Sequence, residues 1–443
     1  MYIKKFIFSL TILFISAAIV LGQNRTLTLS EALALARENN LTGKSALARM
    51  ETAKAQYRMT NSVFLPGLEV SYTGVSTNDP LAAFGFKLKQ EIVTQADFVP
   101  ATLNEPGSVE NFQTKLEIQQ PLLNMDGIYA RKAAKKQLEA MTFQATRIGQ
   151  NIRFEVKKAY YLLVLARESI AVFEKSVRGA EEALRLTREN EAQGLAKKAD
   201  VLEASVRLEE RKNQLLAAKN KKETANDFLV HLLAMSTGEQ IIPVDSLVQP
   251  PVQVSLALNS IHIENRSDIR AFQKQVEAGQ NRVKANQMKF IPHVNVLGTF
   301  EWNDDKFLGA SANNYMLGAS FSWRLFNGYK NAGAVQQSKA LLNEARYNFD
   351  DYLSQSQIQI KRTLRKIQLN YHRIASGKRA KEQALESLRI RTNRFKQGLE
   401  KTADLLMAEA LAAQKELEFI QAIYNYRQAV FEMELLIEKD INE

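Results

Sequence analysis

Side chains able to do chemistry are few in this chain, and most of them are scattered. Cysteine is absent, which removes thiolate metal sites and cysteine nucleophiles. The four histidines include no pair at the spacing of metal ligands: His231, His262, His293 and His372. The letters TGKS at Thr42–Ser45 end a phosphate-binding motif, but Glu38 stands where that motif needs its first glycine. We therefore expect no enzyme activity, no metal site and no cofactor.

Two aspartates, Asp200 and Asp404, stand out because each lies in a copy of one motif. The copies are AQGLAKKADVLEA, beginning at Ala192, and KQGLEKTADLLMA, beginning at Lys396, and they agree at eight of thirteen positions. The chemistry open to a carboxylate here is electrostatic. It can complement the positive end of a helix dipole, and several together can favour cations.

Long helices joined by a tight turn are expected to position these aspartates. Heptad-spaced apolar residues run without a break from Ile152 to Leu184 on one side of the first motif, and a similar seam flanks the second. Gly194 and Gly398 are expected to end the outgoing helices in the left-handed conformation. Together these features predict two long helical hairpins.

The start of each returning helix differs between the copies. Thr402 is a good N-cap, whereas Lys198 stands in the equivalent place and is a poor one. We therefore expect the first turn to be looser than the second.

The whole chain repeats this plan twice. A shift of 226 residues aligns Phe64-Leu65-Pro66 with Phe290-Ile291-Pro292, and the shift falls to 204 at the two motifs. The chain is therefore a tandem duplication of about 220 residues per half.

Each half also contains two stretches in which apolar and polar residues alternate. Four strands of this length and pattern are typical of outer-membrane barrels, although a soluble β-sandwich would alternate in the same way. If the strands cross a membrane, the following positions are expected to face lipid: Leu68, Val70, Tyr72, Leu116, Ile118, Val294, Val296, Phe300, Leu317, Phe321 and Trp323.

The N-terminus reads as a cleavable signal peptide. Lys4 and Lys5 precede the apolar run 6–21, and small residues lead to a cleavage site after Gly22; a membrane anchor is the alternative. The formal net charge of +11 would suggest nucleic acid in a cytosolic protein, but we expect no nucleic-acid partner for an exported one.

A signal peptide, duplicated halves, two strands per half and two hairpins with G-L-x-x-x-A-D-[VL]-L tips together resemble the TolC family of outer-membrane efflux and secretion channels. The resemblance implies a fold that is mainly α with membrane β. Three chains would supply twelve strands to one barrel in the Gram-negative outer membrane, and their helices would form a periplasmic α-barrel. It also implies a passive exit duct for a periplasmic adaptor and an inner-membrane pump of the RND, ABC or MFS type.

The resemblance assigns roles to the tips. Gly194, Leu195, Gly398 and Leu399 would dock onto the adaptor, and Asp200 and Asp404 would line the closed periplasmic entrance. Three positions depart from the family pattern, one of them Arg324, which stands where the first half has Pro121. Met407 stands where a second entrance aspartate is expected, and Glu400 replaces a basic residue associated with the closed state.

The expected organisation follows the duplication. It comprises a signal peptide (1–22), an N-terminal equatorial helical segment (23–66), a strand pair with a long external loop (67–121), a hairpin with its tip near 190–200 (122–237), an inter-repeat equatorial segment (238–266), a helix (267–292), a second strand pair (293–326) and a second hairpin with its tip near 394–404 (327–443).

Some alternatives stay open at this stage. The loop within 78–110 is expected to be ordered over the barrel mouth, although a plug or receptor role is possible. A trimeric envelope scaffold or surface receptor without transport, and a soluble periplasmic coiled-coil protein, are the competing functions. The sequence does not choose among drugs, metal ions and polypeptides as cargo.

Overall fold

The computed structural model describes residues 24–248 and 263–441. The signal peptide expected at 1–22 lies outside these residues. The elements are β1 (Asn24–Leu27), α2 (Leu29–Asn39), α3 (Leu41–Met59), η1 (Thr60–Val63), β2 (Gly67–Thr77), α4 (Pro80–Lys89), η2 (Gln95–Phe98), α5 (Pro100–Asn104), β3 (Val109–Leu123), α6 (Met125–Ala192), α7 (Lys198–Leu233), β4 (Gln240–Pro243), η4 (Ile263–Asn265), α8 (Ser267–Met288), β5 (His293–Asp304), β6 (Ala312–Ser322), α9 (Lys330–Lys396) and α10 (Thr402–Ile437).

The chain divides into two compact units. Of the described residues, one unit contains 24–48, 144–248, 263–269 and 352–441, and the other contains 49–143 and 270–351. Several helices continue from one unit into the other. Among residues 24–248 and 263–441, no helix combines the length and apolar composition that a membrane span requires.

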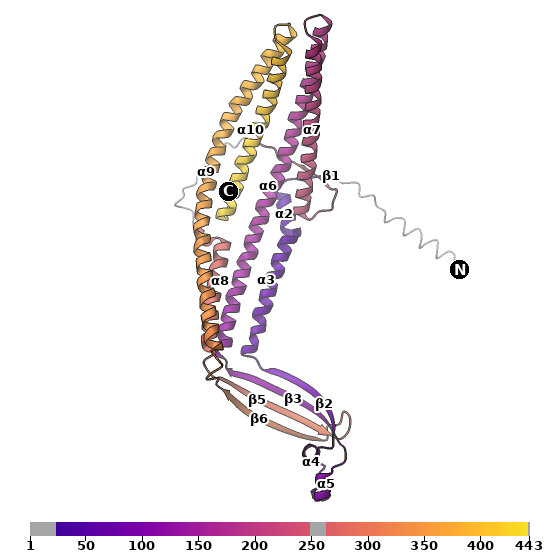
Figure 1. Ribbon diagram of the computed structural model, residues 1–443, viewed down its shortest axis with the longest axis vertical. Helices are drawn as coiled ribbons and strands as arrows, with labels where there is room; N and C mark the ends of the chain where they lie inside the picture. The colour runs from indigo at the N-terminus through magenta and orange to yellow at the C-terminus, as the bar shows by residue number, and fades with distance from the viewer. Residues whose placement is uncertain (1–23, 249–262, 442–443) are drawn as a thin grey trace, which may run out of the picture. The chain divides into compact units, whose positions relative to one another are not determined.

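The first unit is mainly helical, with a two-stranded parallel sheet of β1 and β4, and its core lies where two hairpins pack together. α6 and α7 form one hairpin and α9 and α10 form the other, side by side in Figure 1. The predicted seam is confirmed, because Val156, Ala159 and Leu163 are fully buried in a cluster that also contains Ile367 and Ile423. Alanine in the seam lets the helices approach closely, and the unbroken heptads account for the length of α6 (68 residues). α9 (67 residues) is as long, although Lys378 and Lys381 stand in its seam.

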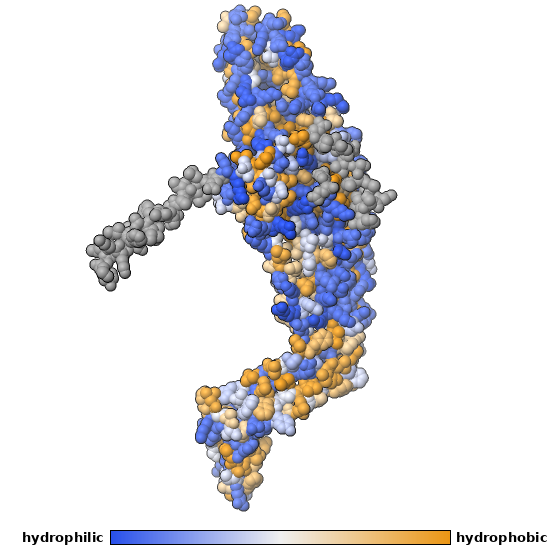
Figure 2. All heavy atoms as spheres, turned by 180° about the vertical axis from the view of Figure 1, so that it is seen from behind, coloured by the Kyte–Doolittle hydropathy of each residue, from blue (hydrophilic) through white to orange (hydrophobic). Residues whose placement is uncertain are grey.

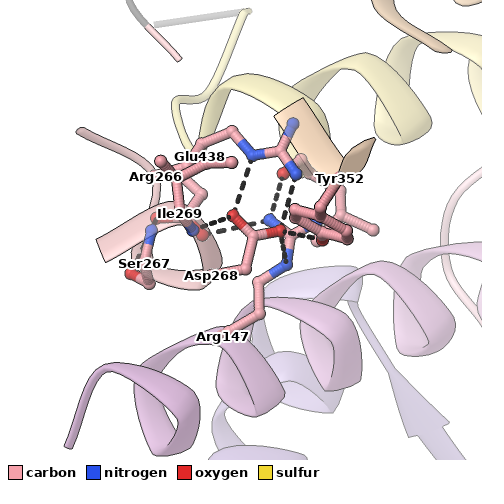
Figure 3. A network of polar contacts seen from close by, with 8 residues as sticks. Arg147, Arg266, Ser267, Asp268, Ile269, Tyr352 and Glu438 are labelled. Carbon is pink, nitrogen blue, oxygen red and sulfur yellow. Dashed lines mark hydrogen bonds and ion pairs between the residues drawn. The ribbon is translucent and has the colours of Figure 1, made fainter. Parts of the chain in front are cut away.

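A buried charge network in this unit joins three helices (Figure 3). Asp268 of α8 accepts hydrogen bonds from Arg266 Nε and Nη2 at 3.0 and 2.6 Å and from the Tyr352 hydroxyl at 2.6 Å, and Arg147 Nε lies 3.2 Å away. Burial alone would raise the pKa of Asp268, but these hydrogen bonds and the charge of Arg147 hold that pKa below its usual value. The network therefore fixes α6, α8 and α9 to one another.

The second unit contains a four-stranded antiparallel sheet in the order β2-β3-β5-β6. Figure 1 shows the four strands lying in one layer. The sequence predicted two strands in each half, and the structure has all four; β6 ends at Ser322, before Trp323. Both halves of the duplication therefore give the same order of a helix, a strand pair and a hairpin.

The connection from β2 to β3 is ordered, as the sequence suggested, but it is not an irregular loop. It holds α4, η2 and α5. Asp79 caps α4 by accepting a hydrogen bond from the Ala82 N–H at 2.8 Å, and Lys87 Nζ closes the connection on itself with Asp97 at 2.7 Å.

Candidate functional site

The two motif copies form the same turn at the hairpin tips. Gly194 has φ of +77° and Gly398 has φ of +71°, so both occupy the left-handed region that favours glycine. In each tip the N–H after the glycine donates to the carbonyl five residues earlier, at 2.8 Å for Leu195 and 3.0 Å for Leu399. Each glycine N–H also donates to the carbonyl three residues earlier, at 2.9 and 3.0 Å. This is the Schellman motif, and it confirms the predicted helix ends.

The predicted caps of the returning helices are wrong. The N-cap residues are Lys197 and Lys401, so Thr402 is the first helical residue and is buried rather than capping. The two tips differ in their side-chain contacts, because Asp200 accepts from a backbone N–H in the first tip and Glu400 pairs with two arginines in the second. Asp200, in the first helical turn of α7, accepts a hydrogen bond from the Lys197 N–H at 2.8 Å, so this N–H is satisfied without a threonine cap.

Asp404 has a different neighbour from Asp200. Its carboxylate lies 3.9 Å from Arg391 Nη1, an ion pair in which both side chains are partly exposed. Among the described residues, no group of three or more His, Cys, Asp or Glu side chains could hold a metal ion. Within one chain, Asp200 therefore caps its own helix start, whereas the Asp404 carboxylate only approaches Arg391.

Glu400 forms the strongest polar contact of the second tip, and the sequence did not reveal it. Its carboxylate pairs with Arg391 Nη1 at 2.7 Å and with Arg394 Nε at 2.8 Å, and the Glu400 side chain is only 11% exposed. Arg394 Nη2 also donates to the Leu399 carbonyl at 3.2 Å. The turn is thus tied to the last helical turns of α9. The spacing of the two arginines on one helix face was the available signal.

The two tips lie against each other in the first unit. A methyl group added at Gly398 would lie 3.9 Å from Leu195 Cδ1. Below the tips, an apolar cluster with Leu184, Val201 and Phe395 joins both hairpins. Leu195 and Leu399 nevertheless remain 66% and 62% exposed, so two leucines stand uncovered at the end of the unit. Such exposed leucines are suited to binding another protein.

The sequence analysis did not single out Glu409 of α10. Burial raises the pKa of its carboxyl to about 7, although the charge of Arg211 acts in the opposite direction. A methyl group added at Gly179 of α6 would lie 3.1 Å from Glu409 Oε1, so the glycine leaves room for this side chain. Nothing in the sequence distinguishes Glu409 from the many other acids on these helices.

The sheet separates apolar and polar side chains onto two faces. The register pairs Leu68 with Ile118, Val70 with Leu116, and Leu116 with Phe300. By the same alternation, ten of the expected lipid-facing residues share one face: Leu68, Val70, Tyr72, Leu116, Ile118, Val294, Val296, Phe300, Leu317 and Phe321. Trp323 lies one residue beyond β6, and its Nε1–H donates to the Phe290 carbonyl at 2.9 Å.

The apolar face is uncovered in the single chain. Val70 is 71% exposed and Leu317 is 76% exposed, and Figure 2 shows hydrophobic side chains gathered over the strands. The opposite face bears charged residues, including Glu69, Lys115 and Glu301. An apolar surface of this size needs another covering, such as lipid or protein.

Comparison with known proteins identifies a family that this chain matches. A family model for the outer membrane efflux protein matches residues 32–234 and 258–437, which together make up most of the chain. Toxin and drug export protein A of Aggregatibacter actinomycetemcomitans is 24% identical over 62% of this chain and 61% of its own length. Outer membrane protein OprJ of Pseudomonas aeruginosa is 24% identical over 70% of this chain and 63% of its own length. The chain thus matches less than two thirds of the length of either relative.

Solved structures show the same fold over a larger part of the chain. The CmeC outer membrane channel of Campylobacter jejuni superposes with a TM-score of 0.80 at 18% identity and covers 92% of this chain and 85% of that chain. This likeness confirms the predicted fold class of duplicated halves with strands and long helical hairpins. The named relatives are export and outer membrane proteins and not enzymes, in agreement with the expectation of no enzyme activity.

Proposed function

The chain belongs to the outer membrane efflux protein family, as its resemblance to TolC channels suggested, and we propose that three copies form the exit duct of a tripartite export system. In this proposal the duct is passive. It conducts substrates from an inner-membrane pump and a periplasmic adaptor to the cell exterior, and the pump supplies the energy.

The observation that carries the proposal is the separation of the sheet into an apolar and a charged face. Four strands cannot close a barrel alone, and the order β2-β3-β5-β6 leaves β2 and β6 at the edges. If β6 of one chain pairs with β2 of the next, three chains supply twelve strands. The apolar face then meets lipid and the charged face lines a water-filled passage.

The assignment of segments to compartments follows from this arrangement. Residues 67–121 and 293–326 would form the membrane strand pairs with their loops. Residues 122–237 and 327–443 would form periplasmic hairpins, the segments 23–66 and 238–266 would lie at the equator, and residues 267–292 would be the helix of the second repeat. In this proposal the protein lies in the outer membrane of a Gram-negative cell, with its helices in the periplasm.

The tips are the proposed docking site for the adaptor. Leu195 and Leu399 are exposed apolar side chains on turns that Gly194 and Gly398 hold in a fixed conformation. Such turns present the leucines without further loss of conformational freedom, which favours binding. The partner pump could be of the RND, ABC or MFS type.

The aspartates beside the tips are proposed to line the periplasmic entrance. A trimer would bring three copies of Asp200 and three of Asp404 toward one axis, and such carboxylate rings favour cations. Cargo is proposed to be of the class named for one relative, toxins and drugs.

The test is ion conductance of the purified protein in a planar bilayer. Wild type is compared with the Asp200→Asn/Asp404→Asn variant, and Glu344→Gln/Asp350→Asn, at two exposed positions of α9, is the control that removes the same number of charges. Small cation-selective openings that enlarge or lose selectivity only in the tip variant support the proposal. Trimers that insert but never conduct in either form would favour an envelope scaffold or surface receptor.

A matched pair of substitutions tests the proposed lipid face. Val70→Lys places a charge on the apolar face and should cost about 2–4 kcal/mol in the membrane, whereas Thr73→Lys, on the other face of the same strand, should cost little. The amount of folded protein recovered from outer membranes measures the difference. Equal recovery of the two variants would contradict the assignment.

A further inference from the structure

The connection between β2 and β3 folds onto the polar face of the sheet, at the end farthest from the tight β2–α3 and β3–α6 junctions. Lys89, the last residue of α4, pairs with Glu301 of β5 at 2.9 Å. The next residue, Gln90, donates through Nε2 to the Glu110 carbonyl at 2.7 Å and to Asn111 Oδ1 at 2.9 Å. Asn111 Nδ2 in turn donates to Asn303 Oδ1 at 3.2 Å. A chain of polar contacts thus joins α4 to β3 and β5.

The burial of side chains beneath the connection shows that it covers part of the polar face of the sheet and not only the edge of the sheet. Asn111, Asn303 and Ala312 belong to the polar face by register, and they are 2%, 0% and 1% exposed. Farther along the same face, Glu69 is exposed. Only the end beneath the connection is therefore closed to solvent in the single chain.

The polar contacts are costly, which argues against a purely structural role. Gln90 Oε1 and Asn303 Nδ2 are buried without a hydrogen-bond partner among the described residues, and each such atom costs stability. An apolar contact would hold a loop more cheaply. Positions that break local rules in this way are often functional.

We propose that this connection is a constriction at the outer mouth of the duct, and that Lys89 and Gln90 determine how large a molecule can leave. The inference rests on the proposed function, because it takes the polar face as the wall of the passage. Three chains would each place one α4 against that wall at its outer end. The ion pair and the amide contacts hold each α4 in place, and Lys89 masks one carboxylate of the wall.

The absence of cysteine gives a clean test in whole cells. Ser71→Cys places a thiol on the polar face, opposite Lys115 and one step inward from the covered end. Cells are treated from outside with a small methanethiosulfonate or with a bulky polyethylene glycol maleimide. Leu81→Cys, at an 84% exposed position of α4, reports free access.

The expected result is access to the thiol that depends on the size of the reagent and on the contacts of Lys89 and Gln90, which we call the anchors. In the otherwise native chain the small reagent should label the Ser71→Cys thiol, and the bulky one should label it slowly compared with Leu81→Cys. Adding Lys89→Met and Gln90→Ala should raise the bulky reagent's rate about tenfold. Lys54→Met, which removes the exposed pair with Glu51, should leave that rate unchanged.

Deleting the connection distinguishes a failure of the proposed constriction from a failure of the proposed duct. Replacing residues 80–104 by a short Gly-Ser linker removes the proposed constriction without relying on the anchors. If the small reagent labels the thiol but neither the anchor variant nor the deletion speeds the bulky reagent, the constriction is refuted while the duct stands. If even the small reagent fails in the deletion, the polar face is not open to the exterior, and both ideas fall.

Discussion

Replacing Glu400 by glutamine should loosen the second hairpin tip while leaving the first one unchanged. Glu400 accepts charge-assisted contacts at 2.7 and 2.8 Å from Arg391 and Arg394, whose side chains are 39% and 55% exposed. Buried contacts of this kind contribute about 1.5–3 kcal/mol each, but exposed pairs contribute less than about 1 kcal/mol. Because Glu400 is buried and its partners are half-exposed, we expect a total loss of about 1–2 kcal/mol.

Hydrogen–deuterium exchange measures this loss locally. The N–H groups of Gly398 and Leu399 are bonded within the turn, so their exchange should accelerate about 5–30-fold in the Glu400→Gln variant. The difference should shrink at about 1 M salt, since screening weakens exposed pairs. Glu386→Gln removes an exposed pair with Arg389 on the same helix and is the matched control. Equal exchange in the two variants would refute the view that Glu400 ties down the turn.

Three further predictions concern the other features of the first unit. Gly194→Ala and Gly398→Ala should each destabilise their own tip by about 1–2 kcal/mol in amide exchange, because φ is positive at both glycines. The added methyl meets no atom closer than 3.9 Å, so this cost comes from the backbone conformation and not from a steric clash. Burial raises the pKa of Glu409 from 4.5 to about 7, so its contribution to stability is full below pH 4.5 and is lost as the pH rises through 7. Glu409→Gln should therefore make the melting temperature depend less on pH across this range. Asp268→Asn should lower stability by about 3–5 kcal/mol in denaturant unfolding, because Arg266 would keep a buried charge without its partner.

Each of these has a control in the same chain. Gly333→Ala, inside α9 with no atom near the added methyl, should be neutral or slightly stabilising. Glu203→Gln, at an exposed position of α7, should leave the pH dependence intact. An Asp268→Asn variant no less stable than Asp350→Asn would show that the network of Figure 3 is dispensable.

Periodic features of this protein could be predicted from the sequence because they depend on neighbours along the chain. Alternation of apolar and polar residues predicted which face of β2 each side chain occupies, with Val70 on one face and Thr73 on the other. Heptad spacing predicted the buried seam through Leu163. Gly194 and Gly398 marked the turns because few other residues adopt positive φ at low cost. The duplication strengthened each of these predictions by providing a second copy.

Contacts between distant residues could not be predicted in this way. Lys89 meets Glu301 from 212 positions away, and neither residue differs in type from many other charged residues of the chain. The N-cap of α10 is Lys401 and was wrongly predicted at Thr402, because local capping preference was weighed without the rest of the turn. Burial of Glu409 depends on the packing of α6 against α10, which periodicity alone does not determine.

The central claim is that the polar face of the sheet lines a conducting passage, and a cysteine substitution tests it most directly. Currents through the cysteine-free protein in a planar bilayer should not respond to a charged thiol reagent. Thr299→Cys, on the polar face opposite Met316, should give currents that the reagent changes within seconds. Val296→Cys, on the apolar face opposite Ala319, should not. A current altered through the Val296→Cys thiol but not through the Thr299→Cys thiol would contradict the account.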